Sequence, residues 1–410
     1  MAQTVSSETR RPRLGAHYWR LWWANAISST GDGAFVAALP LLAVTISRDP
    51  RLVAVVTAAG YLPWMVLSLP AGALVDHYDR ATLMWRAQAV QAAVVAAVAV
   101  LVVFRTANIA VLGLAGLLLG SAEVVFSNAA QAVLPALVPP ALLARANGSQ
   151  QVSLTVGETF LGPPAGSLLF AAAAALPFGL DAASFAGSAA LLARLPRASH
   201  AQEAGQPRAT IRSQIGEGLR WLFRHRLLRV VAVLLGVFNF GNQMGQAVLV
   251  LLATQVLHTG IRGYGLLLAV TAVGSVIGGL VCPAVTRWLG LLPSLIIAGA
   301  ADAAVFVGLG LAPDPAVAAL LLAGEGFAVT MWNVVTVSLR QQVVPAHLLG
   351  RVNSVYRMLG WGLMPLGALA GGFVAHAAGL RAPYIVAGLL CGVCLLAATP
   401  LLLAAGRDQG

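Results

Sequence analysis

Carboxylic acids lie inside several long apolar runs of this sequence. Asp32, Glu123 and Glu325 each interrupt such a run, as do Glu158 and Asp302. A charged side chain at the centre of a membrane-inserted helix costs roughly 2.5–3.5 kcal/mol, so each acid needs a partner or a function. A carboxylate that is neutral in one state and charged in another can carry a proton. Asp32, Glu123 and Glu325 are therefore candidate proton carriers, and the alternative for Asp32 is a fixed hydrogen-bond acceptor.

Polar side chains accompany these acids at helical spacing. Asn25, Ser28 and Asp32 fall at i, i+3 and i+7, which places them on one helical face. Amides, hydroxyls and an aromatic ring on such faces can bind a small amphipathic molecule, and the alternative is that they only hydrogen-bond one helix to another. The candidate cavity residues are Asn25, Ser28, Gln131, Asn239, Gln243, Gln246, Trp332 and Asn333.

The composition requires a lipid environment. Hydrophobic residues make up 59% of the 410 residues and charged residues only 10%, which is too little polar surface to cover a water-soluble domain. A helix needs roughly 20 apolar residues to cross the hydrocarbon core. The sequence contains about twelve such runs, so we expect an all-α integral membrane protein with twelve transmembrane helices.

The predicted helices follow one another with short connections. The first run is too long for a signal peptide and lacks a convincing cleavage site, so we expect it to be retained. The predicted spans are 19–46, 52–75, 82–104, 108–134, 147–174, 176–194, 228–256, 263–286, 289–312, 315–339, 349–377 and 380–405.

Positive charge is distributed unevenly between the two sides of these spans. The net charge is +11, and all 25 basic residues are arginines. If the N-terminus is cytoplasmic, about 20 arginines fall on that side and about five on the other, which is the positive-inside pattern. We therefore expect a multi-pass protein of the cell membrane with both termini in the cytoplasm, and we expect no nucleic-acid partner.

Motifs for cofactors and metals are missing. A phosphate-binding loop ending in Gly-Lys-Ser/Thr requires a lysine, and the sequence has none. Cys391 and Cys394 form a CxxC inside an apolar run, where small packing residues are the expected interpretation. We expect no cofactor, no metal site and no catalytic residues.

The sequence repeats itself at an offset of half its length. Residues 138–149 read VPPALLARANGS and residues 344–355 read VPAHLLGRVNSV. Two six-helix pseudo-repeats of this kind place a substrate site between the halves near the bilayer midplane. The predicted domains are an N-terminal half at 1–195, a cytoplasmic linker with an amphipathic stretch at 196–227, and a C-terminal half at 228–410.

A charged stretch, GALVDHYDR, ends the second predicted span at residues 72–80. An aspartate at a helix end can interact with the positive N-terminal end of a neighbouring helix, and a nearby arginine can pair with another acid. Gly72, Asp76, Asp79 and Arg80 are thus predicted to form a conformational latch that closes in one state and opens in another. The alternative is a charged loop that only ends the helix and sets topology.

The spans, the repeat and this stretch together resemble the major facilitator superfamily. GALVDHYDR is similar to the signature that follows the second helix of that superfamily, and it matches at the four latch residues, whereas His77 replaces an expected arginine. GDGAFVAALPLLA (31–43) and VVPAHLLGRVNS (343–354) resemble the branch of drug-proton antiporters that contains the enterobactin exporter and macrolide-efflux proteins. The resemblance implies that helices 1, 4, 7 and 10 line a central cavity and that the latch contacts the start of helix 11.

Glycine and proline cluster in the fifth predicted span. Gly157, Gly162, Pro163 and Gly166 loosely resemble the helix-5 pattern of drug-proton antiporters. Glycine allows close helix contact and proline removes a backbone hydrogen bond, so this helix can pack tightly and bend. We predict a gate at these four residues.

The sequence favours a secondary transporter of small amphipathic molecules. We expect a proton-coupled exporter of a drug, antibiotic or siderophore, acting as a monomer in the lipid bilayer with protons as the second ligand. The alternative within transport is an uptake symporter or a facilitator of a small metabolite. A more distant alternative is a non-transporting receptor or a membrane enzyme, for which no nucleophile or metal pattern is present.

Overall fold

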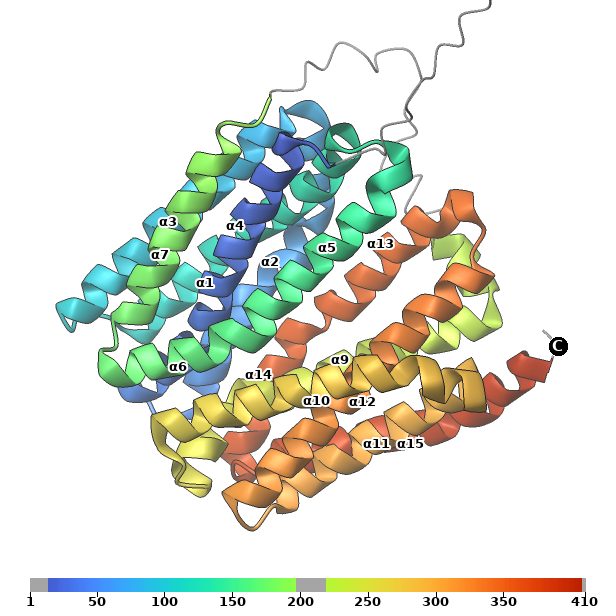
Figure 1. Ribbon diagram of the computed structural model, residues 1–410. Helices are drawn as coiled ribbons and strands as arrows, with labels where there is room; N and C mark the ends of the chain where they lie inside the picture. Colours follow the sequence, from blue (N-terminus) through green and yellow to red (C-terminus); the bar gives the residue numbers. More distant parts are fainter. Residues whose placement is uncertain (1–13, 197–218, 408–410) are drawn as a thin grey trace, which may run out of the picture.

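The computed structural model describes residues 14–196 and 219–407, and all regular structure in these ranges is helical (Figure 1). The first group of helices comprises α1 (Ala16–Ile46), α2 (Pro50–His77), α3 (Arg80–Val103), α4 (Ile109–Leu137), η1 (Pro140–Leu142), α5 (Leu143–Thr155), η2 (Val156–Leu161), α6 (Gly162–Ala172) and α7 (Leu176–Leu192). The second group comprises α9 (Arg226–Leu251), η4 (Leu252–Val256), α10 (Gly260–Leu289), α11 (Leu291–Leu311), α12 (Pro315–Val343), α13 (Ala346–Gly362), α14 (Met364–Ala378) and α15 (Ala382–Arg407). The predicted all-α class is confirmed.

Ten helices in the described ranges are long and apolar enough to cross a membrane. They account for ten of the twelve predicted spans. The other two, 147–174 and 176–194, are also helical, but the π-helix η2 interrupts the first and α7 in the second has only 17 residues. At a rise of 1.5 Å per residue α7 is about 26 Å long. The prediction of twelve spans is thus confirmed for ten by length and composition.

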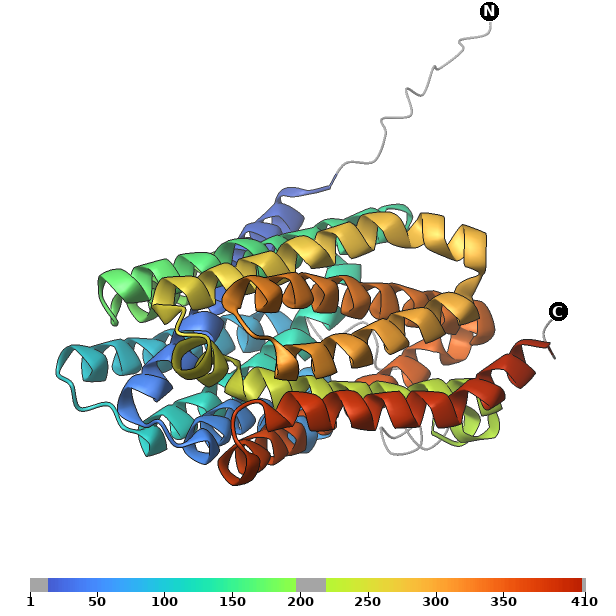
Figure 2. The same ribbon diagram turned by 90° about the horizontal axis from the view of Figure 1, so that it is seen from below.

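Short polar side chains set the starts of several helices. Asp49 caps α2 by accepting the Arg51 N–H at 2.9 Å, and Asp314 caps α12 by accepting the Ala316 N–H at 2.8 Å. Such caps satisfy backbone donors that the first turn leaves free. Both caps lie in short connections at which the chain reverses direction, and the long helices lie side by side (Figure 2).

The two helix groups meet at one end of the molecule and diverge toward the other (Figure 1). We call the end at which α7 stops and α9 starts the linker end, and the opposite end the far end. One apolar cluster at the far end contains residues of both groups, among them Leu41, Val53, Val248 and Phe306. Toward the linker end the apolar core is divided into one cluster in the first group and another in the second. The two groups are therefore held together mainly at the far end.

Small residues allow the close contact between the groups at the far end. In α14, a Cβ on Gly372 would meet the Ala54 side chain and would lie 2.9 Å from the Pro50 carbonyl oxygen of α2. In α10, a Cβ on Gly265 would lie 2.5 Å from Cβ of Ser167 in α6. We call these two contacts, made by Pro50, Ala54, Ser167, Gly265 and Gly372, the far-end seal.

An ion pair lies at the edge of this seal. Asp49 pairs with Arg51 at 2.7 Å, and His376 of α14 places Nδ1 3.7 Å from the same carboxylate. Hydrogen bonds from the Arg51 side chain and backbone N–H lower the pKa of Asp49 from 3.8 to about 2. Asp49 is therefore a fixed negative charge at neutral pH, and His376 of the second group lies beside it.

Part of the predicted domain division lies outside the described residues. The linker prediction, 196–227, falls mostly on residues 197–218, of which the structure describes nothing. Residues 219–224 are helical and α9 begins at Arg226, close to the predicted start at 228. The domain boundaries remain a prediction.

Candidate functional site

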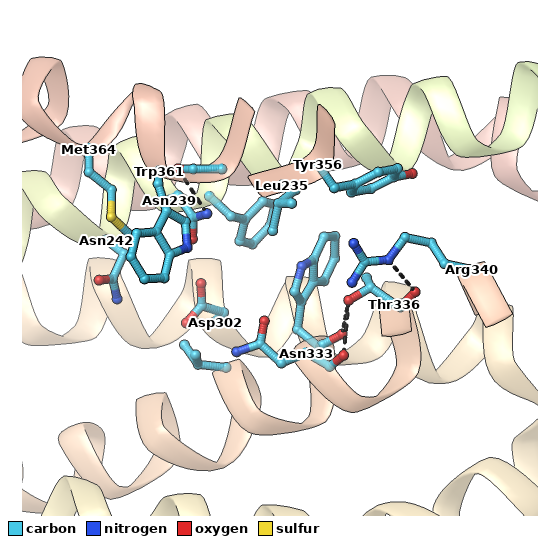
Figure 3. A pocket seen from close by; sticks show the side chains of 14 residues that line it. Leu235, Asn239, Asn242, Asp302, Asn333, Thr336, Arg340, Tyr356, Trp361 and Met364 are labelled. Atoms are coloured by element: carbon cyan, nitrogen blue, oxygen red, sulfur yellow. Dashed lines mark hydrogen bonds between the residues drawn. The ribbon is translucent and has the colours of Figure 1, made fainter. Parts of the chain in front are cut away.

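A cavity of about 330 Å³ lies within the second helix group, lined by residues of α9, α11, α12, α13 and the start of α14. Figure 3 shows side chains from these helices projecting toward it. Polar side chains on its wall include Asn239, Asn242, Asp302 and Asn333. A volume near 300 Å³ or above with a few convergent polar groups is typical of a small-molecule site.

Aromatic rings form much of the apolar part of the wall, together with Leu235, Val329 and Met364. Trp332 stacks on Phe238 with ring centroids 4.7 Å apart and an interplanar angle of 17°. Gly299 of α11 makes room for this ring, because a Cβ there would lie 3.0 Å from Cζ3 of Trp332. The Trp332 Nε1–H is buried without a hydrogen-bond partner in the part of the chain that the structure describes. The ring is thus fixed by packing, while its donor stays unpaired.

Glu325 lies beside the cavity on α12. Its side chain is 3% exposed, and Oε1 accepts hydrogen bonds from Asn242 Nδ2 at 2.9 Å and from Gln246 Nε2 at 3.2 Å. Two amide donors on one oxygen suit an ionised carboxylate. Because Asn242 also lines the cavity, a change in the charge of Glu325 would change the cavity wall.

Arg340 lies on α12 nearer the linker end. Its guanidinium packs over the Tyr356 ring, 4.5 Å from the centroid, and its Nε donates to the Thr336 carbonyl oxygen at 3.3 Å. Tyr356 in turn donates to the Leu228 carbonyl oxygen at 2.6 Å. The cation of the cavity therefore already has partners on the wall.

Two contacts of α9 and α13 reach the first helix group. Trp361, which lines the cavity, meets Trp64 of α2 edge-on with ring centroids 4.1 Å apart. Gln243 of α9 interacts with Tyr61 of α2. Both contacts lie at the boundary between the groups, and because Trp361 lines the cavity, this part of the wall depends on how the groups are arranged.

The acids of the first helix group lie near one another. Asp32 on α1 is half-buried and interacts electrostatically with Glu123 on α4, Glu158 on η2 and Asp181 on α7. Glu123 accepts a hydrogen bond from Gln91 Nε2 at 3.1 Å. Asp181 is fully buried and accepts from the Ser184 hydroxyl at 3.2 Å. Asp32 and Glu123, predicted separately from the sequence, thus belong to one acidic group.

The remaining predicted cavity residues are found in several environments. Asn25 is 7% exposed and donates to Gln150 Oε1 of α5 at 2.9 Å, and the Ser28 hydroxyl donates to the Asn25 carbonyl oxygen at 3.3 Å. Gln131 is exposed near the linker end of α4. Asn239 donates to the Gly360 carbonyl oxygen at 3.1 Å. The structure brings Asn239, Trp332 and Asn333 together at the cavity, and it places Asn25, Ser28 and Gln131 in the other group.

The predicted helix-5 gate is a site of close packing against α1. A Cβ on Gly162 would meet Cα of Gly33, and its next contact would be the Gly33 carbonyl carbon at 2.6 Å. Pro163 and Pro164 lack backbone N–H groups, which accounts for the π-helix immediately before them. Whether this segment acts as a gate remains a prediction.

The predicted latch is only partly described. The side chain of Asp76 lies outside the described residues, as do several at the start of α13. Asp79 caps α3 by accepting the Thr82 N–H at 2.8 Å, and Arg80 donates to the Ala132 carbonyl oxygen of α4 at 2.9 Å. A Cβ on Gly72 would meet nothing within 4 Å. The latch therefore remains a prediction.

Several residues of the cavity were not among the predicted cavity residues, including Asp302, Tyr356 and Trp361. Asp302 was visible as an acid inside a span, but nothing in the sequence pointed α11 at the cavity. Tyr356 and Trp361 lie on α13, whereas the predicted cavity residues lie on other helices. The signal that could have identified Asp302 is its position, because it is an acid deep in a predicted span with no basic residue near it in the sequence.

Comparison with known proteins gives a consistent family. The family profile described as transmembrane secretion effector matches residues 12–407. The multidrug efflux pump Tap of Mycobacterium tuberculosis is 27% identical over 384 residues, covering 90% of this chain and 89% of Tap. The crystal structure of the nucleoside transporter NupG superposes with a TM-score of 0.76 at 13% identity, covering 94% of this chain and 99% of NupG. The crystal structure of a bacterial homologue of the iron transporter ferroportin, in an inward-facing state, superposes with a TM-score of 0.73 at 15% identity. The superposition covers 95% of this chain and 98% of the homologue.

Proposed function

The chain belongs to the transmembrane secretion effector family of the major facilitator superfamily, and on that premise we propose that this membrane transporter exports small amphipathic molecules by alternating access. Its similarity to the efflux pump Tap supports export, and the cavity lined by Trp332, Asn333 and Asn239 supports an amphipathic substrate. The cavity is the observation on which the proposal depends, because it combines stacked aromatic rings with amide groups.

The arrangement of the two helix groups supports alternating access. The groups share an apolar cluster at the far end and have separate clusters toward the linker end. With the linker end in the cytoplasm, as the arginine distribution predicts, this conformer opens toward the cytoplasm. An exporter loads its substrate from that side. Transport then requires the far-end seal to open and the linker end to close.

Proton coupling is the second part of the proposal. Glu325 is buried, and Asn242 both donates to it and lines the cavity. Protonation would remove the acceptor charge and free the Asn242 amide to reorient, so proton binding and substrate binding would act on one side chain. One charge moved through 100 mV yields about 2.3 kcal/mol, enough for a gradient of roughly 40-fold per proton. Asp32 and Glu123 are the competing carriers in the first group.

The proposal is tested by transport in membrane vesicles. Inside-out vesicles carrying the full chain are energised with a proton gradient, and accumulation of a panel of fluorescent drugs is followed with and without a protonophore. We expect gradient-dependent accumulation that Glu325→Gln abolishes and Asp314→Ser preserves. Ser retains the cap of α12, and Asp314 lies in the far-end loop.

Other outcomes would decide against the proposal. Accumulation in right-side-out vesicles, driven inward by the same gradient, would indicate the alternative of an uptake symporter. Equilibration of substrate without any effect of the protonophore would indicate a facilitator. If Asp314→Ser lost gradient-dependent accumulation to the same extent as Glu325→Gln, the effect of replacing Glu325 would not be specific.

A further inference from the structure

Asp302 is a buried acid without a partner on the wall of the cavity. Its side chain is 4% exposed, and Oδ1 has no hydrogen-bond partner among residues 14–196 and 219–407. Figure 3 shows the carboxylate among the side chains that surround the cavity. A buried carboxylate normally gains hydrogen bonds or an opposite charge, because the alternative is a large loss of solvation free energy. The missing partner points to a ligand.

The charged surroundings of Asp302 determine which ligand fits. Glu325 interacts with Asp302 electrostatically, and it carries the same sign of charge. Arg340 lines the same cavity but is engaged by the Tyr356 ring and the Thr336 carbonyl oxygen. Asp302 thus has an acid beside it and no basic partner among the described residues, so a cationic ligand would supply the opposite charge that it lacks, whereas an anionic ligand would lie beside two acids.

The apolar surroundings determine the rest of the ligand. Asp302 and Trp332 line one cavity, and Trp332 is fixed by stacking on Phe238 at 4.7 Å. Trp361 adds a second indole on the side of the first helix group, where Trp64 contacts it. Aromatic faces attract both flat apolar rings and cations.

We propose that this cavity binds a planar aromatic cation, with Asp302 as its counter-ion and the indole of Trp332 as its stacking surface. The proposal names the substrate class of the transporter proposed above and rests on that function. Asp302 would then determine specificity for charge, whereas Glu325 on the neighbouring helix is the candidate proton carrier.

The test uses direct binding to the purified full chain in detergent. Ethidium is a planar aromatic cation whose fluorescence anisotropy reports binding, and dihydroethidium is its uncharged reduced form with the same ring skeleton. We expect ethidium to bind and dihydroethidium to compete at least about tenfold more weakly. Asp302→Asn, which keeps the shape of the side chain, should weaken ethidium binding at least about tenfold and leave dihydroethidium competition unchanged. Asp302→Glu and the control Asp314→Ser should retain ethidium binding.

Each outcome bears on the proposal. Equal affinity of wild type for the two compounds, no ethidium binding, or unchanged ethidium binding by Asp302→Asn would overturn it. The wild-type comparison of the two compounds remains decisive if Asp302→Asn fails to fold. Because binding is measured without a gradient, charge-selective binding by a protein that exports nothing would overturn the proposed function alone. Export of neutral compounds without preference for cations would overturn only the assignment of substrate class.

Discussion

Asp32 is the acid whose replacement best separates proton coupling from substrate binding. It lies within a GDG on α1 and interacts with Glu123, Glu158 and Asp181, while the candidate substrate cavity lies in the other helix group. Asp32 competes with Glu325 for the role of proton carrier: if Asp32 carries the coupling proton, Asp32→Asn, which imitates the protonated acid, abolishes gradient-driven export and leaves ethidium binding within about twofold of wild type. Transport assays in vesicles and anisotropy with purified protein measure the two effects. Concentrative export that still collapses with a protonophore would transfer the coupling role to Glu325.

The ion pair of Asp49 makes the stability of the folded protein depend on pH in a direction that can be predicted. Its pKa is lowered from 3.8 in an unperturbed state to about 2 by Arg51. A carboxylate with a lowered pKa stabilises the folded state above its unfolded pKa and loses this effect as pH falls toward its folded pKa. We predict that Asp49→Asn lowers the melting temperature in detergent by a constant amount at neutral pH, and that the difference shrinks between about pH 4 and pH 2. A difference that grows on acidification would contradict this account of the ion pair.

Among the elements, the contact between α1 and α6 offers a matched pair of glycine substitutions. The added Cβ of Gly162→Ala would overlap backbone atoms of Gly33, and a backbone cannot relax as a flexible side chain can. We expect it to destabilise the protein by about 1–3 kcal/mol. Gly148 of α5 has nothing within 4 Å of its Cβ position, so Gly148→Ala should be neutral or stabilise by up to about 1 kcal/mol. Thermal unfolding in detergent compares the two, and equal effects would show that the close contact is unimportant.

The elements also show what the sequence alone could predict. The helices follow from runs of apolar residues because the bilayer sets their length, and the interruption before Gly162 follows from two adjacent prolines. The bond between Glu325 and Asn242 joins residues 83 positions apart, so it depends on how α9 packs against α12. The sequence identified Glu325 as an acid within its span. It gave no information on the rotation of α11 that directs Asp302 toward the cavity, since α11 carries no other charged residue.

For the whole molecule, the far-end seal predicts how the conformational balance can be changed. A Cβ on Gly372 would meet Ala54 and would lie 3.2 Å from Cα of Arg51. Under the proposed alternating access these contacts would be lost when the far end opens, so we predict that Gly372→Ala raises the population of the far-end-open state, about tenfold for each 1.4 kcal/mol of strain. Gly179→Ala, near the same end of α7 with nothing within 4 Å, is the control.

The measurement is a distance between spin labels across the far end. Labels at Arg48→Cys and Ala378→Cys, both exposed positions, report on the separation of the two groups once the three native cysteines are replaced. We expect Gly372→Ala to increase the fraction of long distances and Gly179→Ala to leave it unchanged. An unaltered distribution in Gly372→Ala would mean that the seal does not limit opening.

The apolar character of the far-end seal also makes the resting state sensitive to temperature. In the proposed transport cycle, opening the seal would transfer apolar surface, including Ala54 and parts of the shared cluster around Leu41 and Val248, toward a water-filled passage. Exposure of apolar surface to water raises the heat capacity, and the attraction that keeps such surfaces together weakens on cooling. The closed far end should therefore lose stability in the cold, and the logarithm of the transport rate should follow a curve, not a straight line, against inverse temperature.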